Sequence, residues 1–284
     1  MRRTVAVALA MFVALPMVAT AQFSASSYSA TKVFLNGVQN QHPAGIAWDG
    51  TSYWSGDGGG ATGNRLAQYN AAGATLNVYA PGLDFRSVFT DAAGNVYGRS
   101  FSDAGIYKMT APGTFSLFTT LVGGTLDAQS SVVLNGAGTG YLAMSGGVVQ
   151  RWNLAGSFLG TTTLAGFGTL GTESIYPQNR GIASFGASWL TYDEGTLSMW
   201  STSGVRLGTT TLTGAGTGFD ANFSFSRAAD GRVFIADALN GNWRGYEVGG
   251  GSVVTTPEPG SAVLVAAGIL GLLVATRNRK RRVT

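Results

Sequence analysis

The sequence feature that most constrains the fold is a pattern repeated five times between about residues 44 and 254. Each repeat holds an apolar strand, an aromatic-containing strand, a third strand and a glycine turn, and four of the five add a further strand, often threonine-rich. Aligning the turn glycines, at spacings of 40, 43, 48 and 46 residues, places one core-type position at Tyr69, Met109, Trp152, Trp200 and Tyr246. Four short strands in each repeat of this length are typical of a propeller blade.

The repeat predicts an all-β, β-propeller-like domain of about five four-stranded blades. A single sheet cannot cover its own faces, but sheets stacked in a ring cover one another. The fifth repeat lacks a convincing fourth strand, and residues 32–38 form a spare strand before the first repeat. We predict that this spare strand closes the ring. A sixth, degenerate blade or a two-sheet sandwich remains an alternative.

The N-terminus has the features of a secretory signal peptide. Arg2 and Arg3 precede an apolar stretch over residues 5–18, and Ala19-Thr20-Ala21 fits the small-x-small cleavage rule. The sequence therefore predicts a signal peptide over residues 1–21 and an extracytoplasmic domain over 22–254. The absence of cysteine excludes disulfides, thiol catalysis and a lipid-anchored N-terminal cysteine.

The C-terminus combines three features in order. Pro257-Glu258-Pro259 disfavours helix, an apolar stretch without polar side chains covers residues 262–275, and five basic residues lie within 277–282. Residues 261–276 would make a short membrane helix, of roughly 24 Å at 1.5 Å per residue, which snorkelling basic side chains can extend. The basic run predicts a cytoplasmic C-terminus.

Together these three features resemble the PEP-CTERM sorting signal over about residues 255–282. The resemblance implies a sorting tail over residues 255–284 that is recognised and cleaved by an exosortase, in a Gram-negative bacterium that makes extracellular polysaccharide. It implies transient anchoring in the inner membrane and then delivery to the cell surface or extracellular matrix, such as that of a biofilm. It implies nothing about the chemistry of the repeats.

The formal net charge of +4 is produced by the two ends of the chain. Seven of the 18 basic residues lie in the first three and last eight positions, which leaves 18 − 7 = 11 basic residues; leaving out Glu258 of the tail likewise leaves 14 − 1 = 13 acidic residues between the two ends. The basic excess belongs to targeting segments, so we exclude nucleic acid as a partner.

Most acidic residues of the repeats fall in loops at one end of the predicted ring. In an up-and-down blade, the connections after the second and fourth strands emerge at the same end. Nine carboxylates fall there: Asp57, Asp84, Asp103, Asp127, Glu173, Asp193, Glu194, Asp220 and Asp237. Carboxylates suit Ca²⁺, and Asp84, Asp127 and Asp220 are the candidate ligands. The alternative is that these residues serve their own turns, where aspartate is common.

The same loops carry aromatic residues that could stack on sugar rings. Trp54, Phe101 and Tyr192 are the candidates, with Asp57, Asp103, Asp193 and Asp237 beside them as a polysaccharide-binding surface. The alternative is that the aromatics belong to the core. His42, the only histidine, precedes the first strand of repeat one and could face the ring axis.

The sequence therefore favours a non-enzymatic surface or matrix protein that binds polysaccharide or another surface component. No H-E-x-x-H, G-x-S-x-G or Walker motif occurs, and no catalytic residue is assigned. The alternative is a Ca²⁺-dependent propeller hydrolase acting on a lactone, phosphate or glycoside. A purely structural role is a third possibility.

Overall fold

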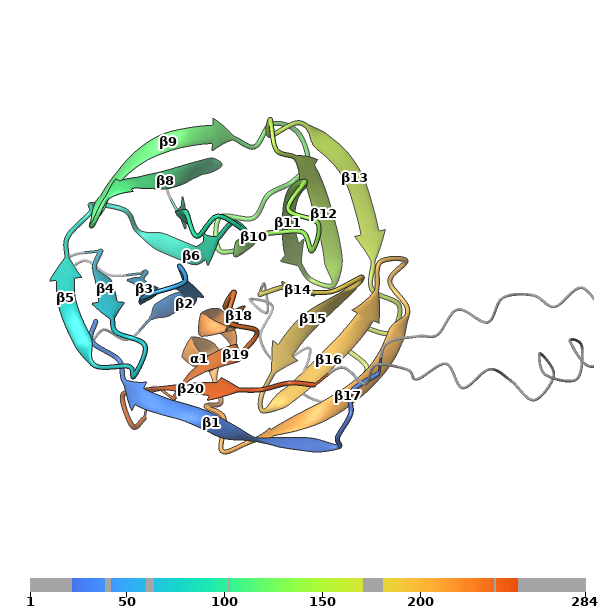
Figure 1. Cartoon of the computed structure of the whole chain (residues 1–284). Helices are drawn as coiled ribbons and strands as arrows, with labels where there is room; N and C mark the ends of the chain where they lie inside the picture. The colour runs from blue at the N-terminus through green and yellow to red at the C-terminus, as the bar shows by residue number, and fades with distance from the viewer. Residues whose placement is uncertain are drawn as a thin grey trace, which may run out of the picture. The chain divides into compact units, whose positions relative to one another are not determined.

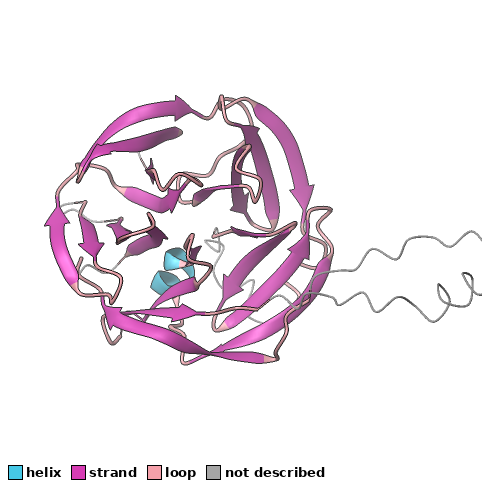
Figure 2. Cartoon of the chain, viewed as in Figure 1, coloured by secondary structure: helices cyan, strands magenta, loops and turns pink. Residues whose placement is uncertain are grey.

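The structure is a computed structural model, and it describes residues 22–38, 42–59, 64–101, 103–170, 181–237 and 239–249. Residues 22–251 form one compact unit. The described residues form twenty β-strands and one short helix. Figure 2 shows that strands make up almost all of the regular structure. The predicted all-β class is confirmed. The predicted signal peptide and sorting tail lie outside the described residues, and within these no helix is long and apolar enough to cross a membrane.

The strands form five antiparallel blades of four, which follow one another around a ring in Figure 1. Blade 1 contains β2 (Pro43–Trp48), β3 (Tyr53–Asp57), β4 (Leu66–Tyr69) and β5 (Thr75–Tyr79). Blade 2 contains β6 (Phe85–Thr90), β7 (Val96–Ser100), β8 (Gly105–Ala111) and β9 (Thr114–Thr120). Blade 3 contains β10 (Val132–Leu134), β11 (Gly140–Ser145), β12 (Val148–Asn153) and β13 (Phe158–Thr163).

The last two blades are joined into one eight-stranded sheet. Blade 4 contains β14 (Ala183–Phe185), β15 (Ser188–Asp193), β16 (Thr196–Ser201) and β17 (Arg206–Thr213). A helix, α1 (Phe219–Ser224), leads into blade 5, which contains β18 (Ser226–Arg227), β19 (Val233–Asp237), β20 (Asn242–Tyr246) and the N-terminal strand β1 (Ser27–Leu35). The blade number therefore agrees with the five sequence repeats.

Ring closure by the N-terminal strand is confirmed. Residues Ala30 to Leu35 of β1 pair antiparallel with β20 and supply the missing fourth strand of blade 5. Residues 27–29 pair in parallel with β17 of blade 4, which links the two blades. The strand begins earlier than the predicted 32–38 and ends at Leu35, because the chain turns at Asn36-Gly37 on its way to blade 1.

The repeated aromatic position is a core position. Tyr69, Trp152, Trp200 and Tyr246 are at most 1% exposed, and Met109 is half-buried. Each third strand thus places a large apolar or aromatic side chain at this position, fully buried in four of the five blades. This burial of a large apolar surface in every repeat is what lets blades of different sequence stack in the same way.

The repeated turn glycine has a second role at the rim of the ring. Gly156 and Gly204 have φ values of 84° and 87°, and a methyl group on either would lie 2.1 Å from the carbonyl oxygen of Thr120 or Thr163 on the preceding blade. Only glycine allows both the left-handed conformation and this close approach. The turn glycines therefore set the spacing between neighbouring blades.

Hydroxyl groups connect the first strands of successive blades, which contact one another all the way around the ring. The four hydroxyl junctions pair Thr90 with Trp48, Ser87 with Val132, Ser184 with Leu134 and Ser226 with Ile46, at distances of 2.7–3.1 Å. The fifth junction, between blades 4 and 5, holds Arg227 in place of a hydroxyl.

Candidate functional site

The structure places the described members of the predicted acidic set at one end of the ring. We call this the acidic end. It contains the connections between second and third strands and those between consecutive blades, including α1. Asp57, Asp193 and Asp237 end second strands, whereas Asp84 and Asp127 precede first strands. Glu173 lies outside the described residues.

The three candidate metal ligands do not come together. Among the described residues, no three His, Asp or Glu side chains form a group that could hold a metal ion. Asp84 accepts hydrogen bonds from Gly59 N (2.7 Å) and Arg86 Nη1 (2.5 Å), and Asp220 contacts His42 Nδ1 at 2.5 Å. Asp127 accepts from Gln129 N in its own turn. Asp127 thus serves its own turn, which was the alternative that the sequence left open, whereas Asp84 and Asp220 contact residues distant in the sequence.

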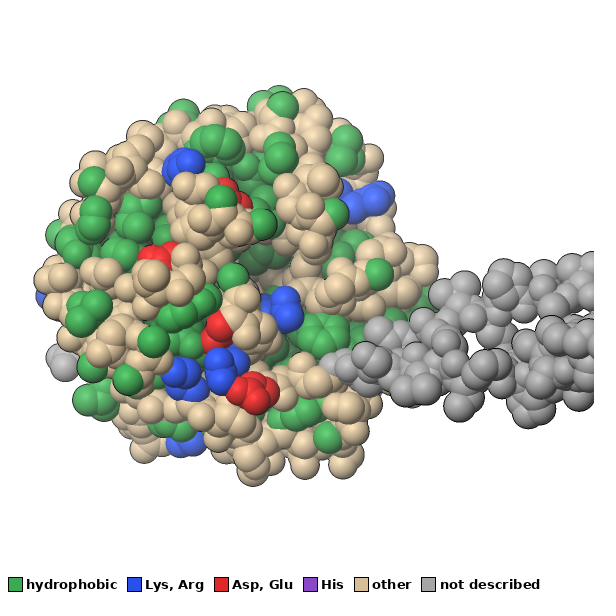
Figure 3. Space-filling view, viewed as in Figure 1, with side chains coloured by type: hydrophobic (Ala, Val, Ile, Leu, Met, Phe, Trp, Pro, Cys, Tyr) green, Lys and Arg blue, Asp and Glu red, His purple; other side chains and the backbone are tan. Residues whose placement is uncertain are grey.

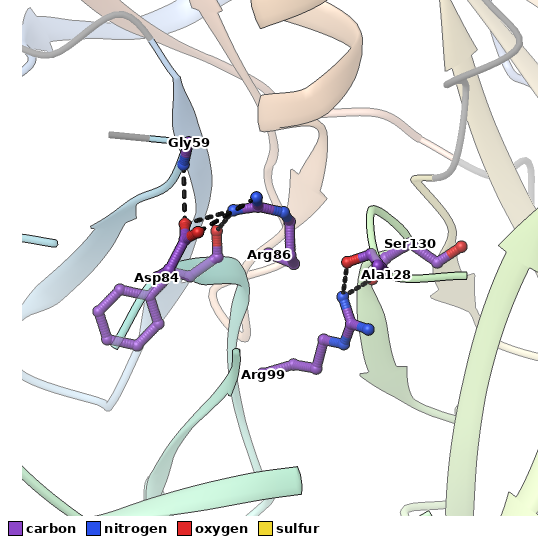
Figure 4. A network of polar contacts seen from close by, with 7 residues as sticks. Gly59, Asp84, Arg86, Arg99, Ala128 and Ser130 are labelled. Atoms are coloured by element: carbon purple, nitrogen blue, oxygen red, sulfur yellow. Dashed lines mark hydrogen bonds and ion pairs between the residues drawn. The ribbon is translucent and has the colours of Figure 1, made fainter. Parts of the chain in front are cut away.

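A buried arginine lies beside Asp84. Arg86 is 3% exposed and forms an ion pair with Asp84, as Figure 4 shows. The β6–β7 register shifts between Phe85 and Ser87, so Arg86 occupies a β-bulge, a device that re-aims a side chain. Its guanidinium lies over the rings of Phe101 (4.4 Å) and Phe223 (5.3 Å). Burial lowers the pKa of Arg86, although the charge of Asp84 opposes the shift.

A second buried arginine, Arg99 on β7, extends toward blade 3. It is 2% exposed and donates to the backbone carbonyls of Ala128 and Ser130, as Figure 4 shows, and also to that of Asp127. Burial, together with the charge of Arg86, lowers the pKa of Arg99 to about 10. The two arginines therefore fasten blade 2 to blades 1 and 3 at the acidic end.

Helix α1 connects the remaining acidic loops. Asn222 donates from Nδ2 to Asp193 Oδ1 (3.4 Å) and Glu194 Oε1 (3.3 Å), and Glu194 also accepts from Gly218 N (2.7 Å). At the other side of the helix, Asp220 holds His42, whose ring meets Phe219 edge-on. These contacts join blades 1, 4 and 5. His42 thus has a side-chain partner in Asp220, whereas the sequence offered two interpretations: a residue facing the ring axis, or a loop histidine hydrogen-bonded to backbone.

Two of the three aromatic candidates are core residues. Trp54 is 2% exposed and donates from Nε1 to Asp49 (2.7 Å), and Tyr192 is fully buried and donates to Gly216 O. The expectation that Trp54 and Tyr192 stack on a ligand is therefore wrong, because their strands are covered on both faces. Phe101 is 39% exposed, but Arg86 covers one side of its ring.

The other proposed polysaccharide contacts are also engaged. Asp57 is fully buried. Asp103 accepts from Gly105 N and from the Tyr107 hydroxyl at 2.7 and 2.6 Å. Asp237 forms an ion pair with Arg244 at 3.0 Å. Burial alone would raise the pKa of Asp237, but the hydrogen bonds from Asn240 and Arg244 outweigh burial and lower the pKa. The acidic end is thus a set of blade-to-blade and turn contacts.

The opposite end of the ring contains a recess of about 290 Å³, and we call it the recess end. The recess is lined where the first strands of blades 2, 3, 4 and 5 finish and turn. Most of its lining is small or apolar, including Ala92, Val133, Ala183 and Ala228. Figure 3 shows a hollow near the ring centre and only scattered charged side chains in this view.

Two charged side chains in this lining differ in their partners. Asp91 accepts bonds from Asn95, Tyr97 and Ala93. Burial alone would raise the pKa of Asp91, but these bonds hold it below its ordinary value. Arg227 is exposed, lies over the Phe185 ring at 5.1 Å, and donates only to Ser184 O at 3.4 Å. Burial of its guanidinium lowers the pKa of Arg227, although the charge of Asp230 opposes the shift.

Arg227 has no ion pair within the described residues. The nearby carboxylate of Asp230 is held by Arg232 (2.8 Å) and by the Tyr53 hydroxyl (2.5 Å). The recess therefore presents one arginine without an ion-pair partner among the described residues, in a lining of mostly small groups that also contains Asp91. Sequence reasoning missed it, because nothing in the two-residue strand Ser226-Arg227 distinguishes this arginine from any other.

No protein-family model matches the sequence, and no curated protein matches it. Solved structures match parts of the chain. They include a functionally unknown protein from Desulfotomaculum acetoxidans (17% identity, TM-score 0.42, covering 60% of this chain and 58% of that one) and BamB from Moraxella catarrhalis (16% identity, TM-score 0.33, covering 77% of this chain and 59% of that one). A gluconolactonase from Xanthomonas campestris matches at 10% identity and a TM-score of 0.46, over 81% of this chain and 98% of that one. The chain thus spans under two thirds of the length of the first two structures.

Proposed function

We propose that this protein is an exported surface or extracellular-matrix protein whose β-propeller binds a polysaccharide without catalysing a reaction. The observation that carries the binding role is the recess at the ring axis, where Arg227 has no ion pair within the described residues and most lining residues are small or apolar. A pocket with mostly apolar walls and a few polar groups is the usual form of a small-ligand site. The ligand contact thus moves from the acidic end, where the sequence placed it, to the recess end.

The proposal includes export and sorting through the two ends of the chain. The signal peptide over residues 1–21 would direct secretion, and Pro257-Glu258-Pro259 with the apolar stretch and basic cluster would be read by an exosortase. The chain would be held in the inner membrane through residues 261–276 before release. The sorting signal supports a destination among extracellular polysaccharides, and the recess supports a means of holding one there.

The experiment separates sorting from binding. The full-length protein is expressed in a PEP-CTERM host with and without its exosortase, and its mass and location are measured. We expect loss of the tail and arrival outside the cell only with exosortase, and retention of the tail when Pro257, Glu258 and Pro259 are replaced by alanine. An unprocessed protein in the wild-type host would contradict the sorting proposal.

The binding role is tested on the same purified protein by co-sedimentation with the polysaccharide of that host. We expect binding with no change in polymer length over prolonged incubation. Failure to bind any extracellular fraction would contradict the binding role. Release of shorter chains or reducing ends would instead favour the hydrolase alternative.

A further inference from the structure

We propose that the recess binds the carboxylate of an acidic sugar unit, with Arg227 as its counter-ion. This inference rests on the proposed polysaccharide-binding function and names the class of sugar that its site recognises. It concerns the recess end of the ring, where the sequence indicated no site.

The position of Arg227 follows from the alternation of side chains along β18. Ser226 faces β2 of blade 1, where its hydroxyl accepts the Ile46 N–H at 2.9 Å. The next residue must then face the other way, toward β14 of blade 4. Arg227 accordingly lies over Phe185 and reaches Ser184 O. Its aliphatic stem and the aromatic ring hold the guanidinium at the wall of the recess.

The unpaired state of this guanidinium is the main argument for an anionic ligand. Arg227 is exposed, and its guanidinium fork keeps N–H donors that no described residue accepts, on the side of the chain that lines the recess. The single protein bond of Arg227 is long at 3.4 Å, whereas the four hydroxyl junctions around the ring measure 2.7–3.1 Å. A bound anion would supply the missing partner.

The charge balance favours a carboxylate over a phosphate or sulfate ester. Arginine presents a planar fork that matches a carboxylate through two parallel hydrogen bonds. One cation balances one negative charge, and the Asp91 carboxylate in the same lining disfavours a dianion. Asp91 keeps its negative charge while it accepts from Asn95, Tyr97 and Ala93, and no ion pair within the described residues joins it to Arg227.

The remaining lining suits the body of a sugar ring. Its volume of about 290 Å³ is at the low end for small-molecule pockets, which limits the ligand to one small unit. The hydroxyl of Ser226, 6% exposed, has no acceptor for its own O–H among the described residues and could donate to a sugar oxygen. Ala183, Ala228 and Val133 offer apolar contact for the C–H face.

The test is a titration of the purified protein with glucuronate and galacturonate, and with glucose and inorganic sulfate as comparison probes. We expect a uronate to bind at least about tenfold more tightly than glucose or sulfate, and more weakly as salt rises. Arg227→Gln should lose at least about tenfold in uronate affinity, and Arg227→Lys, which keeps the charge without the fork, should lose less. Lys108→Gln, a charge change on β8 outside the recess lining, should leave binding unchanged.

Thermal melting shows whether each variant is folded, and the Lys variant tests the same contact should the Gln variant fail to fold. Equal binding of glucose and uronate, no uronate binding at all, or uronate binding that neither Arg227 variant weakens would overturn the inference. If the protein sediments with a polysaccharide but ignores free uronate and the Arg227 substitutions, the proposed function stands and this inference falls. If it sediments with none, the proposed function fails as well.

Discussion

The two ends of the ring use charge in opposite ways. The acidic end has the greater number of charged side chains, but Asp84, Glu194 and Asp220 each have partners on a neighbouring blade or on α1. The recess end has fewer, and there Arg227 is left without an ion pair within the described residues. The number of charged residues in a set of loops therefore indicates where blades are joined; the availability of a charge for a ligand depends on its partners.

The largest expected effect comes from removing a buried cation at the acidic end. Arg99→Met leaves the carbonyls of Asp127, Ala128 and Ser130 without their donor, and unsatisfied buried acceptors are costly. We expect the free energy of unfolding to fall by about 2–4 kcal/mol and the melting midpoint by about 5–15 °C.

The matched substitution at the recess end is Arg227→Met. Because this arginine makes one long hydrogen bond, the melting midpoint should change by less than about 2 °C. Thermal unfolding by circular dichroism measures both variants. Equal losses of stability in Arg99→Met and Arg227→Met would contradict the proposed difference between the two ends of the ring.

A second effect, of similar size, concerns the rim glycines. Gly204→Ala introduces a methyl group at φ 87° against Thr163 O, so both strain and a backbone clash oppose it. The control is Gly82→Ala in the acidic end, at φ 76° with no atom within 4 Å of the added methyl. We expect a loss of about 2–4 kcal/mol for Gly204→Ala and about 1–2 kcal/mol for Gly82→Ala in denaturant unfolding. Similar losses would show that blade spacing at the rim is adjustable.

Acidification should weaken both ends. The pKa values of Asp91 at the recess end and Asp237 at the acidic end lie below the usual 3.8. Their contribution to stability is therefore fully present above about pH 4–5 and is lost as pH falls through the lowered values. We expect the melting midpoint to be nearly constant from pH 7 to 5 and to fall below pH 4. In Asp91→Asn the midpoint at pH 7 should be lower and its fall in acid shallower; an unchanged acid profile would count against this role of Asp91.

The smallest expected effect is that of calcium. The carboxylates of Asp84 and Asp220 are already engaged by Arg86 and His42, so a cation would have to displace existing partners. Melting midpoints in excess calcium and in chelator should agree within about 1 °C. A site saturated at 100 times its Kd would stabilise the ring by about 2.7 kcal/mol, and a shift of roughly 5–10 °C would restore the acidic end as a metal site.

The blades could be predicted from sequence because their signals are local. Apolar alternation, the aromatic position represented by Trp152 and Trp200, and the turn glycines all recur at a readable spacing. Even the closing strand could be predicted, since the fifth repeat lacked a fourth strand and an unassigned strand preceded the first.

The site could not be predicted, because it depends on contacts between blades. Arg86 is buried through a bulge that the sequence does not mark, and Arg99 through carbonyls of the next blade. The sequence placed Trp54 and Tyr192 beside the correct loops. It did not show the neighbouring residues that bury their rings and keep them from a ligand. The recess is assembled from the strand ends of four blades, and no single repeat contains its pattern.

Ring closure also fixes how the domain would respond to a mechanical load. Ser24 N donates to Gly249 O at 3.0 Å, and the Tyr28 hydroxyl donates to the same oxygen at 2.7 Å, so the first and last described segments lie side by side. From there β1 and β20 run antiparallel. Tension between Ser24 and Gly249 would act along the hydrogen bonds at the end of the ladder between β1 and β20. It would therefore break these bonds one after another, starting from that end. Tension applied at only one of these two segments would not pass through the blades. A protein of this design withstands pulling when it is tethered by one end, and opens at β1 when it is stretched by both.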